Sequence, residues 1–258
     1  MPISIITRAY RTSELKTLIQ NLNLNDQISK EILAVCNIND YNFDYIENFN
    51  LIIEHSNRFQ ARITGIKNAK YNKILFLDSD QIPEKGLLNE INNSDKDMLI
   101  IPERSINRNF TGKCLDDWRC RNEKYAMKNP NPEIPVIPRY YKKDYLISII
   151  NKLPFKIYKI IDHEDSILYY MVFNETRNIG FTKSHIYNYD PSIVVLMRKA
   201  FEYGKNKKEI KRIELPYDIY QLINLLNKSS LNVKELGLGK GYIIQSLRGI
   251  AYVCGSLL

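Results

Sequence analysis

Short apolar segments alternate with longer amphipathic ones through the first hundred residues of the chain. We expect strands over residues 3–6, 32–35, 51–54 and 73–77, each built mostly from Ile, Leu, Val, Phe or Ala. A polar turn over 7–12 separates the first strand from a helix capped by Ser13, and a second helix over 57–69 precedes the fourth strand. This order predicts an α/β domain whose mostly parallel sheet is flanked by helices.

The pattern is less regular in the middle of the chain and helical toward its end. Pro102 stops a strand over 98–101, and residues 103–138 are polar and proline-rich, which predicts a binding loop or a disordered segment. We expect helices over 144–152, from His163 and over 192–203, extended segments at 179–181 and 185–187, and a helical end broken at Gly237, Gly239 and Gly241.

The composition is that of a soluble globular protein with an uneven excess of positive charge. Of 258 residues, 44% are hydrophobic and 26% are charged, and the formal net charge is +8. Residues 191–258 hold 11 Lys and Arg against 5 Asp and Glu. This basic region suits an anionic partner such as phospholipid head groups, although a solvated helical surface explains the charge equally well. It lacks the interleaved aromatics of a nucleic-acid module, so we expect no nucleic acid partner.

Cysteine and histidine usage argues against a structural zinc site. The four cysteines form no Cys-x-x-Cys pair, and the three histidines stand far apart in the sequence. No basic-apolar-small signal peptide opens the chain, and no uncharged apolar run reaches the roughly 18 residues of a membrane span. We therefore expect a cytoplasmic protein.

The most informative motif is Asp78-Ser79-Asp80, because it ends an apolar strand. Ligands of open α/β sheets bind beyond the carboxyl ends of the strands. Two aspartates held there can share a hard divalent cation, and the cation can hold a diphosphate. A short Asp-x-Asp also occurs by chance in solvated turns, so the motif alone leaves both interpretations open.

Several segments, taken in order, resemble glycosyltransferase family 2, whose members transfer sugars from nucleotide-diphospho-sugars on a GT-A fold. The matching segments are 3–11, 57–66 with its Arg and Gly, 74–80 with its Asp-x-Asp, 162–165 with its Glu-Asp pair, and 198–204 with its basic-aromatic-Gly pattern. The resemblance implies a GT-A catalytic domain over 1–190, with a nucleotide-binding half 1–101 and an acceptor-binding half 102–190. A basic helical C-terminal region, 191–258, follows it.

The same resemblance implies a set of donor-binding residues: Thr7, Arg8, Ala9, Tyr10, Asn37, Asp40, Arg62, Asp78 and Ser79. The chain departs from the family after its second strand, where relatives carry acidic residues and this chain has Cys-Asn-Ile-Asn-Asp. Asn37 or Asp40 takes over recognition of the base there, which leaves the choice between a UDP-type and a GDP-type donor open.

The implied reaction moves a hexose to an acceptor hydroxyl with inversion at the anomeric carbon. In a single displacement, a base takes the acceptor proton while the diphosphate leaves from the opposite face. Asp165 is the expected base and Glu164 its orienting partner, although acidic residues at a helix start are also common caps. Asp80 and Asp78 are the expected ligands of Mn²⁺ or Mg²⁺, with Asp190 or His185 as a third.

Two regions bear on the acceptor, expected to be a glycan or a lipid-linked saccharide. Trp118 and Asp117 suit an acceptor site, since aromatic rings stack on sugars and carboxylates bind their hydroxyls. A tryptophan that anchors a loop in the core is an equally good explanation. The apolar stretch 242–254 is amphipathic. This stretch has a structural role if it packs against the core. If it lies on an anionic membrane instead, the enzyme is a peripheral membrane protein.

Other function classes fit the sequence less well. A nucleotidyltransferase normally carries a Gly-rich phosphate loop after its first strand, and residues 7–12 contain no glycine. A catalytically degenerate GT-A-like protein that binds a nucleotide or a glycan is the alternative that we retain, because the second-strand motif is altered.

Overall fold

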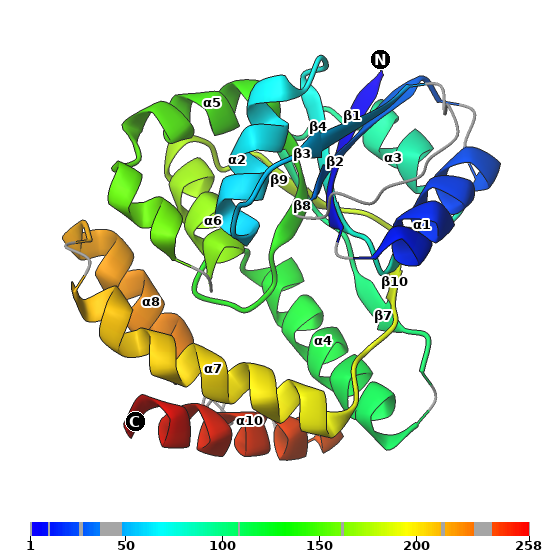
Figure 1. The fold of residues 1–258 in the computed structure, drawn as a ribbon. Coiled ribbons are helices and arrows are strands. Elements are labelled where there is room, and N and C mark those ends of the chain that lie inside the picture. The colour runs from blue at the N-terminus through cyan, green and yellow to red at the C-terminus, as the bar shows by residue number, and fades with distance from the viewer. Residues whose placement is uncertain are drawn as a thin grey trace. The chain divides into compact units, whose positions relative to one another are not determined.

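A computed structural model describes residues 2–9, 11–25, 28–36, 48–107, 109–160, 163–212, 215–229 and 239–257 (Figure 1). The expected donor-binding residues Tyr10, Asn37 and Asp40 lie outside them. The chain forms two compact units, each assembled from distant segments. The first consists of Met1–Pro102, Pro138–Leu153 and Leu168–Tyr187, and the second of Glu103–Ile137, Pro154–Ile167 and Asn188–Leu258. The expected functional division at residue 190 stays a prediction.

The first unit is built on a seven-stranded sheet with the strand order β3-β2-β1-β4-β8-β6-β9. Its strands are β1 (Ile3–Ala9), β2 (Lys30–Cys36), β3 (Phe49–Ile53), β4 (Lys73–Asp78), β6 (Met98–Ile100), β8 (Pro138–Lys142) and β9 (Ile179–Phe181). Neighbouring strands are parallel, except that β8 runs antiparallel to both β4 and β6. The mostly parallel sheet expected from the sequence is confirmed.

Helices cover both faces of this sheet (Figure 1). On one face lie α1 (Thr12–Asn25) and α3 (Leu87–Asn93), and on the other lie α2 (Arg58–Asn68) and α5 (Lys143–Lys152). The helix α6 (Glu164–Glu175) begins in the second unit and ends in the first. The short strand β5 (Gln81–Pro83) pairs with β10 (Ile186–Asn188), along which the chain leaves the first unit.

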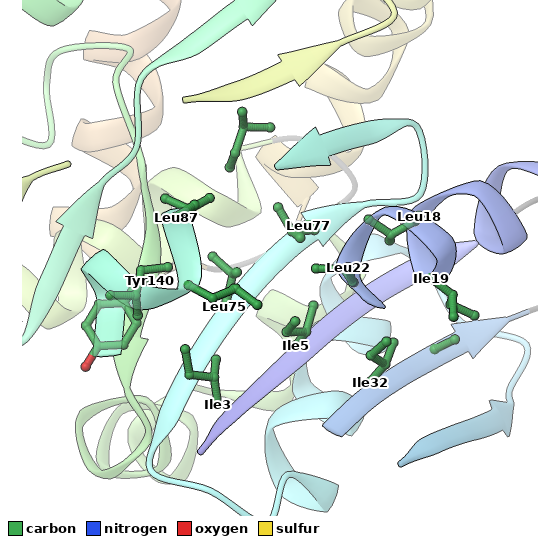
Figure 2. Packing of buried hydrophobic residues seen from close by; sticks show 14 of the residues in the cluster. Ile3, Ile5, Leu18, Ile19, Leu22, Ile32, Leu75, Leu77, Leu87 and Tyr140 are labelled. Atoms are coloured by element: carbon green, nitrogen blue, oxygen red, sulfur yellow. The ribbon is translucent and has the colours of Figure 1, made fainter. Parts of the chain in front are cut away.

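Every second side chain of the central strands points toward α1 and α3, and these side chains form the core beneath the two helices. Ile5, Leu75 and Leu77 point to this face and are at most 2% exposed. Figure 2 shows these side chains meeting Leu18 and Leu22 of α1. Because β1 and β4 are covered on both faces, both sets of alternate residues must be apolar, which explains the continuous apolar runs in the sequence.

On the opposite face, α2 begins with a capping box and lies very close to β1. The Asn57 side chain accepts a hydrogen bond from the Gln60 N–H at 2.9 Å, and the Asn57 N–H donates to Gln60 Oε1 at 3.0 Å. A methyl group on Gly65 would lie 2.4 Å from Ile6 Cγ2. Only glycine permits this approach, which brings the other side chains of α2 to the end of the sheet.

The second unit is mostly helical. It contains β7 (Glu103–Ser105), α4 (Phe110–Lys128), the 3-10 helix η1 (Phe155–Lys159), α7 (Ile193–Arg212), α8 (Tyr217–Ser229) and α10 (Lys240–Leu257). Among the described residues, none of the helices combines the length and the apolar composition needed to cross a bilayer. The helical C-terminal region expected from the sequence is confirmed.

The two long helices α7 and α10 run side by side in the same direction (Figure 1). Near their beginnings, Leu196 packs against a cluster that contains Ile244. Farther along, a methyl group on Gly204 would lie only 2.1 Å from the carbonyl oxygen of Tyr252. The two backbones therefore touch at this glycine, and a larger residue there would push the helices apart.

The expectation of an irregular segment over 103–138 is wrong, because α4 occupies 19 of these residues. Asn109 caps the helix, since its side chain accepts a hydrogen bond from the Gly112 N–H at 2.9 Å. The buried positions mix small, polar and apolar residues, so no apolar stripe marks the helix in the sequence. They are Thr111, Gly112, Cys114, Leu115, Asn122, Glu123 and Ala126.

The expected turn over 7–12 is also wrong in part. Thr7, Arg8 and Ala9 belong to β1, because hydrogen bonding to β2 continues through Ala9. The helix α1 begins at Thr12, so Ser13 lies inside it and is not its cap. Gly241 likewise lies within α10 and does not break it. In each case, a strand or helix extends farther than local turn preferences suggest.

We expect the two glycines Gly249 and Gly255 of α10 to respond in opposite ways to alanine. Gly255→Ala places a methyl group 2.0 Å from the carbonyl oxygen of Phe201, and should lower the free energy of unfolding by about 1–3 kcal/mol. Gly249→Ala meets no atom within 4 Å and should raise it by roughly 0.5–1 kcal/mol through helix propensity. Urea unfolding of both variants checks this, and equal effects would contradict the close packing of α7 and α10.

Candidate functional site

Arginines surround Asp78 at the carboxyl end of β4. Arg62 Nη2 lies 3.9 Å from Asp78 Oδ1, and Arg139 Nη1 lies 3.7 Å from Asp78 Oδ2. The two guanidinium groups are 8% and 12% exposed, whereas the Asp78 side chain is 35% exposed. We call Arg8, Arg62 and Arg139 the arginine group. Its members come from β1, α2 and β8, so only the fold assembles it.

Strand pairing explains how these arginines meet. The parallel register of β1 and β4 places Arg8 opposite Asp78. Because β8 runs antiparallel to β4, its first residues lie at the carboxyl end of β4, and Arg139 is the second residue of β8. Positive charge therefore gathers at the edge of the sheet where open α/β proteins bind ligands.

Each arginine is held by further contacts. Arg8 Nη2 donates to the backbone oxygen of Ser56 at 2.8 Å, and the Arg62 guanidinium stacks 5.0 Å from the centroid of the Phe76 ring. A small pocket beside them is lined by Ile6, Thr7, Arg8, Arg58, Ala61, Arg62, Phe76, Leu77 and Asp78. The Thr7 hydroxyl in it is buried and lacks a hydrogen-bond partner in the described part of the chain. Such a pocket offers both fixed cations and a hydroxyl to an anionic ligand.

The rest of the Asp78-Ser79-Asp80 motif forms a tight turn after β4. The Asp78 N–H donates to Gln81 Oε1 at 2.9 Å, and Ser79 Oγ donates to Glu14 Oε2 at 3.2 Å. Asp80 is exposed. The turn thus presents one aspartate to solvent and holds the other among arginines.

The described residues contain no group of three His, Cys, Asp or Glu side chains placed to hold a metal ion. This does not conflict with magnesium chemistry, because Mg²⁺ is usually bound by one or two carboxylates together with substrate phosphates and water. The donor set of Asp78 and Asp80 fits that mode. The role of these residues as metal ligands stays a prediction.

The first proposed third ligand, His185, is paired with Glu84. Glu84 Oε2 lies 2.9 Å from His185 Nδ1 and accepts the His185 backbone N–H at 2.8 Å. The side-chain hydrogen bond with His185, followed by the backbone one, lowers the pKa of Glu84 below its usual value. This pair joins β5 to the start of β10.

The other proposed third ligand, Asp190, is bound by Arg119 of α4. Arg119 Nη1 and Nη2 donate to Asp190 Oδ2 and Oδ1 at 2.9 and 2.6 Å, and the Asp190 side chain is 4% exposed. Burial alone would lower the pKa of Arg119, but the hydrogen bonds that it donates to Asp190 and the charge of Glu103 raise it. Both Asp190 oxygens therefore have a strong partner without any metal.

The expected catalytic pair lies at the start of α6, in the second unit. Glu164 is 2% exposed, and Asp165 is partly exposed. His163, directly before them, has a φ of 60°, a left-handed conformation that is uncommon outside glycine. Such backbone conformations cluster at functional sites.

The expected acceptor residues lie on α4 and contact the start of α10. Asp117 Oδ2 accepts the Gly241 N–H at 3.0 Å, and its Oδ1 accepts from Arg121 Nε at 3.0 Å. Burial raises the pKa of Asp117, but these hydrogen bonds outweigh it and the net shift is downward. Trp118 is half-buried, with its Cβ against Gly241. Both residues join α4 to α10, and their acceptor role stays a prediction.

Sequence reasoning missed two arginines that the structure makes prominent. Arg139 follows Pro138, and a proline in a short polar segment argues against the central strand that β8 forms. Arg119 gives no sign of its role in the sequence, because its partner Asp190 is 71 residues away in the chain. Neither ion pair leaves a local signal in the sequence.

Asp190→Asn distinguishes a structural ion pair from a metal ligand. If Arg119 is its partner, the variant should lose about 3 kcal/mol of stability without any metal, because the mostly buried guanidinium loses the charge of its bidentate partner. Urea unfolding in the presence of a chelator measures this. Glu133→Gln removes one negative charge from an exposed position of the same unit and should have little effect. Unchanged stability of Asp190→Asn would refute the structural role.

The fold is similar to that of known glycosyltransferase structures. No protein-family profile and no curated sequence matches the chain. The crystal structure of residues 1–349 of S. aureus TarS matches with a TM-score of 0.57 and 15% identity, over 99% of this chain and 81% of that one. The complex of the same fragment with UDP matches with a TM-score of 0.57 and 17% identity, over 93% and 76%.

A third match is the complex of that fragment with UDP-GlcNAc, with a TM-score of 0.56 and 16% identity, over 98% of this chain and 80% of that one. Identities this low show a shared fold. The glycosyltransferase fold expected from the sequence is therefore confirmed.

Proposed function

We propose that this chain is a family 2 glycosyltransferase that moves a hexose from a nucleotide-diphospho-sugar, of UDP or GDP type, to an acceptor hydroxyl. Support comes from a fold similar to that of TarS, whose structures include complexes with UDP and UDP-GlcNAc. The observation that carries the proposal is the arginine group around Asp78, at the ligand-binding edge of the sheet.

The arginine group would bind the diphosphate of the donor. Each guanidinium offers five N–H donors in a fixed fork, and those of Arg62 and Arg139 lie 3.9 and 3.7 Å from Asp78 at this edge of the sheet. Arginine binds phosphate through paired, charge-assisted hydrogen bonds. The negative charge that grows on the leaving diphosphate would therefore be stabilised by groups already held in place.

Asp80, with Asp78 beside it, would hold Mn²⁺ or Mg²⁺ together with the diphosphate. When bound, the ion supplies Lewis-acid stabilisation of the leaving group. Asp80 is exposed in the turn and can reach a bound ligand. Asp78 would also keep Arg62 and Arg139 oriented.

Asp165 would act as the general base. The acceptor oxygen attacks the anomeric carbon, its proton passes to Asp165, and the carbon–oxygen bond to the diphosphate breaks on the opposite face, which inverts the configuration. Asp165 lies in the first turn of α6 and is partly exposed. Glu164 is buried next to it and would orient the base.

The acceptor would be a glycan or a lipid-linked saccharide. Trp118 offers a half-exposed aromatic surface for a sugar ring. Asp117 already accepts hydrogen bonds from Arg121 and Gly241, so it would contribute through its remaining acceptor capacity.

Nucleotide binding is the first test. We expect one of UDP, GDP, dTDP and CMP, at about 100 times its Kd, to raise the melting temperature by about 5 °C in the presence of Mn²⁺. The increase should disappear in Asp80→Asn and persist in Asp95→Asn, which alters an exposed aspartate of the same unit. Thermal unfolding with and without Mn²⁺ measures this.

Each result of this panel has a definite meaning. Stabilisation that does not need Mn²⁺ would keep the nucleotide site and reject Asp80 as a metal ligand. No response to any nucleotide would reject the transferase proposal. Binding without any hydrolysis or transfer of the corresponding nucleotide-sugar would favour the degenerate binder.

Asp165→Asn tests the base. A general base contributes about 10²–10⁴-fold to the rate, so we expect a loss of this size in kcat with the Kd for the nucleotide unchanged. Asp218→Asn is the matched control, because Asp218 also lies in the first turn of a helix, α8, and is exposed. Equal activity of Asp165→Asn and the unmodified protein would overturn the assignment.

A further inference from the structure

The outward face of α10 carries a continuous apolar stripe. Ile243, Ile250, Val253 and Leu257 are 48%, 60%, 54% and 76% exposed. Their spacing follows the helical period, so they lie along one side of the helix. Isolated exposed apolar residues are ordinary, but a row along a whole helix marks an interaction surface. We call these four residues the α10 stripe.

The helix α10 contributes no acidic residue to the stripe. The sequence of α10 has no Asp or Glu, and its two basic residues are Lys240 and Arg248. Arg248 turns inward, because its Nε is buried and its Nη1 donates to the buried Gln245 at 3.3 Å. The stripe is thus uncharged from Ile243 to Leu257.

Positive charge is supplied by the neighbouring helix α7. Together α7 and α10 carry nine Lys and Arg against two Glu. Arg198, Lys199 and Lys205 are exposed, and the Lys205 backbone lies beside Gly255 of α10. Because the two helices run in parallel and Gly204 lies against Tyr252, Lys205 lies alongside the second half of the stripe.

We propose that the surface formed by the α10 stripe and the exposed cations of α7 binds the surface of an anionic lipid bilayer. An uncharged apolar stripe buries itself at the boundary between head groups and acyl chains, and neighbouring Lys and Arg attract anionic head groups. The two signals lie together on one helix pair, as stable peripheral binding requires. This proposal does not depend on the transfer reaction.

Charge favours a lipid surface over a second copy of the chain. A twofold dimer through α10 would bring the same surface of each copy together. The exposed cations Arg198, Lys199 and Lys205 of the two copies would then come close together, with Glu202 as the exposed acidic residue among them. An anionic bilayer removes this repulsion and replaces it with attraction.

Vesicle sedimentation of the full chain, without nucleotide, tests the proposal. We expect binding to vesicles of equal parts phosphatidylcholine and phosphatidylglycerol, none to pure phosphatidylcholine, and release at high salt. Ile250→Glu should weaken binding about tenfold or more, since it removes one buried side chain from the bilayer. Met127→Glu makes the same change at a 51% exposed position of α4 and should bind normally. Unchanged urea unfolding confirms that both variants fold.

Several results would overturn the proposal. These are no binding to either vesicle, equal binding of Ile250→Glu and Met127→Glu, and binding that is insensitive to salt. A concentration-dependent dimer in sedimentation velocity, lost in Ile250→Glu, would assign the surface to a second copy instead. Nucleotide binding is measured separately, so failure here leaves the transferase proposal intact.

Discussion

The pairing of β1 between β2 and β4 is the constraint on which the first unit depends. Its register sets which residues face α1 and which face α2, and a shift by one residue would exchange the two faces. The same register places Arg8 beside Asp78. The register of β1 therefore fixes both the hydrophobic core, which lies on the faces of the strands, and the candidate donor site, which lies at their ends.

Two kinds of aspartate can be distinguished among the candidate site residues by the contacts that their carboxylates make. Asp190 and Asp117 accept two or more hydrogen bonds from Arg119, or from Arg121 and Gly241, which ties helices and strands of the second unit together. Asp78 contacts its arginines at longer range and remains partly exposed, and Asp80 is exposed. A buried carboxylate with strong short contacts is suited to structure, whereas a partly exposed carboxylate among cations can meet a ligand.

In the second unit, the long helices approach one another closely at glycines. Gly204 and Gly255 bring α7 and α10 into backbone contact, and Gly241 lies against Trp118 of α4. Because the helices contact one another through these small residues, several large apolar side chains of α10 are left facing outward. Gly241 and Gly255 thus lie on the packed face of α10, and the α10 stripe lies on its exposed face.

The sequence by itself determined the strands of the parallel sheet, because a strand covered on both faces must be apolar throughout and is visible as such. It also determined α2, whose capping box is local, and the position of Asp78-Ser79-Asp80 at the end of β4. Tertiary structure alone decided α4, β8 and the ion pairs of Asp78 and Asp190. The buried face of α4 is mixed in polarity, β8 begins with proline, and the arginines lie far along the chain from their partners. Pairing between distant residues leaves no local pattern, since it depends on which strands and helices pack together.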